Sequence, residues 1–277
     1  MEKITTFTSY YDSQISFNNR FFTNIASRHT NAQTHNAIEF IYLTNGNITY
    51  TIDEKTYNVE SDGLIITPPR KLHTITFNNL DIYERFDVIC DENLIFPEIY
   101  EKILNAPDVI NCKKLPIFLE LFKKLDYYCK HFSGDVLKNL LSHLIDEIAY
   151  NIIIATTSSL ETQDYSFDNM FSEIIEYIEN NISKKITLEK ICDEMYISSS
   201  YLHYIFRKNL NITPKKYIDL KRLIIAQNYL QMGMIPVKVC EKCGFSDYSV
   251  FFRKYKSHFG YSPSEEKDKN SIKDIIC

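Results

Sequence analysis

The chain has 277 residues, of which 44% are hydrophobic and 24% are charged, so it is long enough for two domains with a core each. No run approaches 18 apolar residues, and the opening MEKITTFTSYYDSQ lacks an apolar signal core, which argues against membrane-spanning and secreted classes. The seven cysteines are scattered and odd in number, as expected in a reducing compartment. We therefore expect a cytoplasmic protein with no membrane partner.

The net charge of −5 hides an uneven distribution. Residues 171–277 carry 17 lysines and arginines against 13 acidic residues, whereas residues 1–170 carry 14 against 23. The two parts therefore have net charges of +4 and −9. A basic surplus confined to one half is a modest footprint of nucleic-acid binding.

Residues 1–94 are predicted to form short β-strands. Their runs are rich in Ile, Tyr, Thr and Phe and are separated by the turn pairs Asn-Gly at 45–46 and Asp-Gly at 62–63. Ile48 and Tyr50 alternate with threonines, as expected for a half-buried strand. Several short strands at this spacing predict a small barrel or sandwich.

Residues 95–156 are predicted to be helical. Leu137, Leu141 and Leu144 recur at i, i+4 and i+7, which places them on one face of a helix. Such helices either cover the β domain or pair across a dimer, and we interpret them as a dimerisation segment. The Ser/Thr-rich residues 157–167 are predicted to be the linker between domains.

Residues 168–265 are predicted to be helical, and residues 266–277 to be a charged tail. This region holds two copies of one pattern, Ile186–Leu210 and Ile235–Gly260. In each copy the pattern predicts a short helix, a tight turn and a second helix. A repeat of this kind predicts two helix-turn-helix motifs that can occupy successive segments of the DNA major groove.

The second helix of each copy has a polar, aromatic and basic outer face. Hydroxyl and imidazole groups suit base edges, whereas arginine and lysine suit phosphates. The candidate DNA contacts are Ser200, His203, Tyr204, Arg207 and Lys208 in the first copy, and Tyr248, Ser249, Phe252, Arg253 and Lys256 in the second.

The two copies together resemble the DNA-binding domain of AraC-family transcription regulators. The resemblance lies in ITLEKICDEMYISSSYLHYIFRK and VKVCEKCGFSDYSVFFRKYKSHFGYSP and covers about residues 170–265. It implies a seven-helix domain, double-stranded promoter DNA and RNA polymerase as partners, activation of transcription, and base contacts by Ser200, His203, Tyr204, Tyr248, Ser249 and Arg253. The chain departs from the family where Cys192 and Cys240 replace the usual alanine and where Tyr204 replaces a common arginine.

The N-terminal half resembles, less specifically, the cupin-type sensor domains of the same family. The matched positions are His35, Glu39, Gly46, Gly63, Pro69 and His73. This resemblance implies a β-barrel that holds a small-molecule effector, often a sugar or a related metabolite. The candidate effector-binding residues are His35, Glu39, Tyr42 and His73.

A metal centre is the alternative interpretation of the same residues. His35, Glu39 and His73 supply two imidazoles and a carboxylate, as in iron facial triads, but Gln33 stands where enzymatic cupins have their first histidine. We interpret the histidines as partners of an effector hydroxyl and expect no metal and no cofactor. Cys240 and Cys243 lack a second cysteine pair and are interpreted as small core residues.

These observations predict a two-domain α+β fold: an N-terminal cupin-like β-barrel with a helical dimerisation segment, and a C-terminal all-α domain with two helix-turn-helix motifs. The predicted function is a sequence-specific, DNA-binding transcription regulator that acts as a homodimer and is not an enzyme. Two alternatives remain open. One is a cupin-type metal-dependent enzyme with an appended DNA-binding domain. The other is a ligand-independent regulator whose N-terminal domain only dimerises.

Overall fold

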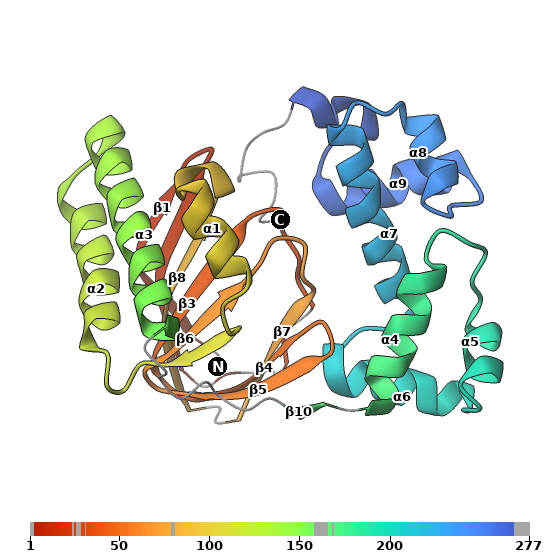
Figure 1. The fold of residues 1–277 in the computed structure, drawn as a ribbon, viewed down its shortest axis with the longest axis horizontal. Helices are drawn as coiled ribbons and strands as arrows, with labels where there is room; N and C mark the ends of the chain where they lie inside the picture. Colours follow the sequence, from red (N-terminus) through yellow and green to blue (C-terminus); the bar gives the residue numbers. More distant parts are fainter. Residues whose placement is uncertain are drawn as a thin grey trace. The chain divides into compact units, whose positions relative to one another are not determined.

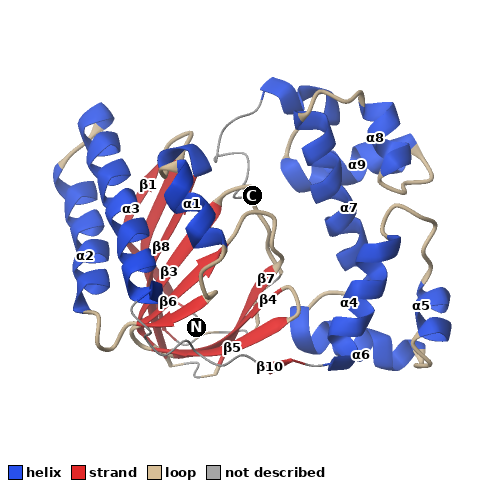
Figure 2. Cartoon of the chain, in the orientation of Figure 1, coloured by secondary structure: helices blue, strands red, loops and turns tan. Residues whose placement is uncertain are grey.

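The computed structural model describes residues 3–23, 25, 29–30, 32–78, 81–157, 166–167 and 169–268. The chain divides into two compact units, Met1–Ser166 and Phe167–Cys277. The first unit is rich in strands and the second is helical, which confirms the predicted α+β fold class (Figures 1 and 2). Most of the predicted linker, Asp168 at the start of the predicted helical region and residues 269–277 of the predicted tail lie outside the described residues.

The first unit contains two β-sheets. The larger sheet has the order β1 (Lys3–Tyr11), β2 (Ile15–Thr23), β8 (Ile82–Cys90), β3 (Ile38–Asn45), β6 (Gly63–Thr67) and β9 (Val109–Asn111). The smaller sheet has the order β10 (Ser166–Phe167), β5 (Lys55–Glu60), β4 (Asn47–Ile52) and β7 (His73–Phe77). The pairs formed by β3 with β6 and β8, and by β4 with β5 and β7, are antiparallel.

The larger sheet continues past residue 94, which we predicted as the end of the β domain. After the short helices η1 (Glu92–Leu94) and α1 (Pro97–Leu104), strand β9 pairs with β6, with Leu64 opposite Ile110. Three residues are too few to show the alternation by which strands are recognised in a sequence. The boundary at residue 94 therefore cuts through one sheet.

Strand β3 is buried on both faces. Phe40 and Tyr42 belong to a core shared with the helices, whereas Ile41 and Leu43 belong to the core that includes residues of the smaller sheet. Helices α2 (Pro116–His131) and α3 (Gly134–Thr157) lie side by side along the larger sheet (Figure 1). The predicted leucine stripe at Leu137, Leu141 and Leu144 is buried in this core. We considered two roles for these helices, covering the β domain and pairing across a dimer. The leucine face of α3 has the first role, because it packs against the larger sheet of the same chain.

The described part of the second unit has six α-helices and a final 3-10 helix. They are α4 (Asn169–Asn181), α5 (Leu188–Glu194), α6 (Ser199–Leu210), α7 (Pro214–Gln231), α8 (Pro236–Lys242), α9 (Tyr248–Phe259) and η2 (Pro263–Asp268). Helix α7 runs between the α5–α6 pair and the α8–α9 pair (Figure 1). Tyr217 of α7 packs against Phe206 of α6, and Leu223 joins Phe251 of α9 in a second core. One helix therefore contributes to the packing of both motifs.

The turns of the two motifs need the same left-handed backbone. Tyr196 has φ of 54° and Gly244 has φ of 77° at the equivalent position. Tyr196 is 95% exposed, whereas a Cβ atom on Gly244 would lie 2.9 Å from the carbonyl oxygens of Ile182 and Ser183. Arg222 donates to that same Ile182 oxygen at 2.9 Å, so the surroundings of Gly244 are fixed. Crowding therefore restricts position 244 and leaves position 196 free of such contacts.

We expect Gly244→Ala to lower the free energy of unfolding by about 1–3 kcal/mol, because it adds both an unfavourable φ and a close contact with backbone oxygens. Tyr196→Ala is the matched control, since it places the same side chain at the same φ in solvent, and we expect a change within about 0.5 kcal/mol. Urea unfolding of the full chain measures both. Equal effects of the two substitutions would contradict the crowding argument.

The predicted charged tail begins inside the second unit. Glu266 is 1% exposed; it accepts hydrogen bonds from Tyr255 of α9 and, at 3.0 Å, from Gln231 at the end of α7. Burial raises the pKa of Glu266, although these hydrogen bonds oppose the shift. A glutamate in a mixed-charge run is usually exposed, and for that reason we predicted that Glu266 belongs to the tail. Its buried position extends the domain beyond residue 265.

We expect Glu266→Gln to remove one pH-dependent part of the stability. Because the folded-state pKa is raised, the contribution of Glu266 is fully present below the unfolded-state pKa of about 4.3 and is lost as the pH rises through the folded-state value. The variant should therefore gain stability relative to the wild type as the pH rises above the unfolded-state pKa of about 4.3. Urea unfolding of both proteins at each pH tests this, and parallel pH profiles would show that Glu266 is not perturbed.

Candidate functional site

The outer face of α6 carries all five residues predicted for the first motif. Ser198 begins the helix, with its hydroxyl accepting from the Tyr201 backbone amide at 3.1 Å. Leu202, Ile205 and Phe206 are buried on the inner face. The exposed outer set is Ser200, His203, Tyr204, Arg207 and Lys208.

Helix α9 repeats this arrangement with one difference. The Asp247 carboxylate accepts from the Val250 backbone amide at 2.8 Å, and Phe251 and Tyr255 are buried. Of the predicted contacts, Ser249, Arg253 and Lys256 are exposed, whereas Tyr248 and Phe252 are half-buried. The rings of Tyr248 and Phe252 lie 6.3 Å apart, so packing against each other covers part of both.

A hollow of about 520 Å³ lies beside Arg253 between α7 and α9. Lys216, Lys254 and His258 line it together with Arg253, and Lys254 is paired with Asp219 of α7. Neither Lys216 of α7 nor His258 of α9 was among the predicted contacts, which were taken from the outer face of the second helix of each repeat. Their shared basic character was visible in the sequence, but their meeting depends on how α7 crosses α9.

The first unit brings together three of its four predicted residues. The Nε2 atoms of His35 and His73 each lie 3.4 Å from Glu39 Oε2. The three side chains are buried: 7% of the His35, 7% of the Glu39 and 4% of the His73 side chain is exposed. His35 precedes β3, Glu39 lies on β3 and His73 begins β7, so the group joins the two sheets.

Burial and charge set the protonation of this group in opposite directions. Burial lowers the pKa of His73 to about 4, although the Glu39 carboxylate opposes that shift. Burial alone would raise the pKa of Glu39, but the hydrogen bond from His35 and the charges of His73, His35 and Arg85 outweigh it and lower the pKa to about 2. At neutral pH the group therefore holds a carboxylate and a neutral His73.

Tyr42 does not lie with the other predicted effector residues. Its ring packs 5.4 Å from the ring of Phe122 on α2, and its hydroxyl donates to Asp62 at 2.9 Å. Glu39 and Tyr42 are three positions apart on β3, and an odd spacing places side chains on opposite faces of a strand. The structure therefore places Tyr42 on the face of β3 opposite to Glu39 and does not bring it together with the other three predicted residues.

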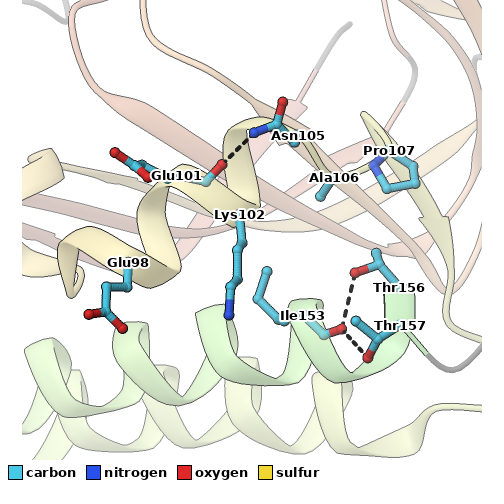
Figure 3. A pocket seen from close by; sticks show the side chains of 9 residues that line it. All are labelled: Glu98, Glu101, Lys102, Asn105, Ala106, Pro107, Ile153, Thr156 and Thr157. Carbon is cyan, nitrogen blue, oxygen red and sulfur yellow. Dashed lines mark hydrogen bonds between the residues drawn. The ribbon is translucent and has the colours of Figure 1, made fainter.

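A second hollow, of about 680 Å³, lies between α1, the loop after it and the end of α3 (Figure 3). Lys102 reaches into it, whereas Asn105 and Thr157 donate to the backbone oxygens of Glu101 and Ile153 within their own helix segments. None of the residues predicted as sites lines this hollow. Its polar groups are thus largely used locally.

Known proteins resemble both units of the chain. The family model for the AraC-like ligand binding domain matches residues 21–84, and that for a helix-turn-helix domain matches residues 191–269. The HTH-type transcriptional regulator YdiP of Escherichia coli K12 is 23% identical over 83% of this chain and 78% of its own length. The chain belongs to the AraC family of transcriptional regulators. This AraC-family chain is thus a DNA-binding transcription regulator with an N-terminal ligand-binding domain.

Other relatives of this AraC-family regulator match it over shorter stretches or at lower identity. The transcriptional activator RhaS of Escherichia fergusonii is 26% identical over 41% of each chain. A solved structure of ToxT from Vibrio cholerae is 13% identical, covers 92% of this chain and 98% of ToxT, and has a TM-score of 0.39. Within the described residues, no helix is both long enough and apolar enough to cross a membrane.

The caps of the two outer helices generate a test of this geometry. We expect Asp247→Ala to lower the free energy of unfolding by about 1 kcal/mol, because it removes the side-chain acceptor for the Val250 amide at the start of α9. Asp193→Ala, which removes an exposed carboxylate from α5, is the control and should change stability by less than about 0.5 kcal/mol. Urea unfolding measures both, and an equal loss in the two variants would reject the cap.

Proposed function

We propose that the chain regulates transcription by placing α6 and α9 in adjacent major grooves of promoter DNA. The observation that carries the proposal is the likeness of the two helices. Each begins at a side-chain cap, buries one face in a core that includes α7, and exposes polar and basic groups on the other face. An α-helix fits the major groove, and two motifs in one chain can read two groove segments.

The proposed contacts divide by chemistry. Ser200, His203 and Tyr204 on α6, and Ser249 and Arg253 on α9, carry groups that can hydrogen-bond base edges. The basic Arg207, Lys208 and Lys256 suit phosphates. Tyr248 and Phe252, half-buried against each other, present a firm apolar surface that suits a thymine methyl group.

We also propose that a small polar, sugar-like effector binds at His35, Glu39 and His73, where two imidazoles and a carboxylate can hold hydroxyl groups. The names of RhaS and of the lactose operon transcription activator of Staphylococcus xylosus support activation. We propose RNA polymerase as a partner on the family resemblance alone. Exposed Tyr127, Phe132 and Val136 near the α2–α3 turn support a homodimer. We also propose that the chain acts in the cytoplasm and that its regulatory role involves no catalysis.

Capture of genomic fragments by the full-length protein, followed by sequencing, tests the proposal. A few promoters with paired half-sites about one helical turn apart would support it. Random fragments that are released at moderate salt would show only non-specific affinity and would contradict sequence-specific regulation.

The two proposed contact classes differ in their response to substitution. We expect Arg253→Ala to weaken binding to a captured promoter site by about 1–3 kcal/mol and to relax the preference at one base pair. Lys256→Ala should weaken binding to all sequences alike and reduce the slope of affinity against salt by about one charge. Lys114→Ala, which removes an exposed charge from the first unit, is the control. Fluorescence anisotropy over a range of salt concentrations measures all three, and unchanged affinity in both α9 variants would refute their assignment.

A further inference from the structure

The buried cluster of His35, Glu39 and His73 has a hydrogen-bonding pattern that is incomplete. His35 Nδ1 lies 2.8 Å from the Ala37 carbonyl oxygen, and His73 Nδ1 lies 3.1 Å from the Lys71 carbonyl oxygen. A carbonyl oxygen only accepts, so each Nδ1 must be the protonated nitrogen of its ring. In a neutral imidazole the Nε2 atom is then a bare acceptor.

When both rings are neutral, both Nε2 atoms are therefore acceptors that point at a third acceptor. Each lies 3.4 Å from the same oxygen of the Glu39 carboxylate, and the three ligand atoms all lie within 4.8 Å of one another. Two lone pairs and an anionic oxygen that converge in a buried place need a positive centre among them. An additional proton on one ring or a metal cation can supply it.

The distances favour the cation. An ion pair with a shared proton brings nitrogen and oxygen to about 2.7–2.9 Å, which is shorter than either contact to Glu39. Donor atoms at about 2.1 Å from a tetrahedral metal lie about 3.4 Å from each other, which is the spacing of both contacts. The separation of Glu39 from its two partners therefore leaves room for an ion and lies at the long end of the hydrogen-bond range.

The half-buried guanidinium of Arg85 is paired with other groups. Arg85 donates to Asp87 at 3.1 Å and to the Tyr83 hydroxyl at 3.4 Å. Asp87 is 3% exposed, so the two opposite charges are paired inside the unit. The Glu39 carboxylate is left with the two imidazoles as its direct partners.

The surroundings hold the imidazoles in place. The ring of Tyr50 stacks on His73 at 6.0 Å between centroids, and its hydroxyl bonds Thr67 at 2.6 Å. Metal-bound histidines commonly donate their second ring nitrogen to a backbone carbonyl, which fixes the tautomer and the ring orientation. Both histidines here have such a carbonyl.

We propose that His35 Nε2, Glu39 Oε2 and His73 Nε2 bind one divalent transition-metal ion such as Zn²⁺ or Fe²⁺. Imidazole and carboxylate donors suit this class of ion, and three protein ligands leave at least one position for water or for an oxygen donor of a small molecule. An oxygen-rich effector would bind through that position, a step that rests on the proposed function. Metal binding itself does not depend on DNA binding.

Calorimetric titration of the chelator-treated, full-length protein with Zn²⁺ and absorption spectra with Co²⁺ test the site. We expect one ion per chain, a Co²⁺ spectrum of nitrogen and oxygen ligation without thiolate, and a higher melting temperature with metal. His35→Ala, His73→Ala and Glu39→Gln should each weaken binding at least about tenfold. His143→Ala, which removes an exposed imidazole from α3, should bind as the wild type does.

Three outcomes would overturn the proposal: no binding by the wild type, equal binding by the wild type and the three cluster variants, or thiolate ligation of Co²⁺. Circular dichroism shows whether each variant is folded. The Co²⁺ spectrum of the wild type decides the ligand class even if a variant does not fold.

Promoter binding by the metal-free protein is measured in parallel. Intact DNA binding without metal binding rejects this site alone, and metal binding without promoter specificity rejects the regulator proposal alone.

Discussion

The first unit depends on a strand that is buried on both faces. In β3 the side chains alternate between the core beneath the helices and the core between the sheets, so almost every position from Ile38 to Leu43 is committed to packing. Glu39 is the one acidic side chain in that run, and burial of an unpaired carboxylate costs several kcal/mol. His35 and His73 meet it from outside β3, and the cation proposed among the three side chains would balance its charge. The alternation that builds the core thus also places the polar cluster.

The second unit depends on the packing of α7. Tyr217, near the start of this helix, packs toward α6, and Leu223, near its middle, packs toward α9. The motifs therefore share one scaffold within this unit, and their relative register follows from side-chain packing. Buried Glu266 ties the end of the unit to α7 and α9 by hydrogen bonds. The protonation state of Glu266 therefore affects the stability of α9, the helix that carries Arg253.

Local rules allowed the two motifs to be predicted from the sequence, and long-range contacts limited the rest. Helix caps and tight turns depend on neighbours within a few residues, so their pattern can be recognised in the sequence. Examples are the caps at Ser198 and Asp247 and the turn at Gly244. The face occupied by Tyr42 was also decidable from the alternation of β3. The pairing of β9, the burial of Glu266 and the approach of Lys216 to Arg253 depend on partners far along the chain. The convergence of both Nε2 atoms on Glu39 needed side-chain geometry as well.

The distribution of charge between the two units affects how the chain can discriminate between DNA sequences. Residues 1–170 carry a net charge of −9 and residues 171–277 only +4, so long-range attraction to DNA is weak for the chain as a whole. Non-specific binding arises from phosphate contacts and counterion release, and a small basic surplus provides little of it. In the binding mode that we propose, discrimination between promoter and bulk DNA would depend on short-range contacts from the outer faces of α6 and α9. A regulator built in this way is sensitive to the exact presentation of a few side chains such as Arg253, which makes the packing beneath them as important as the groups themselves.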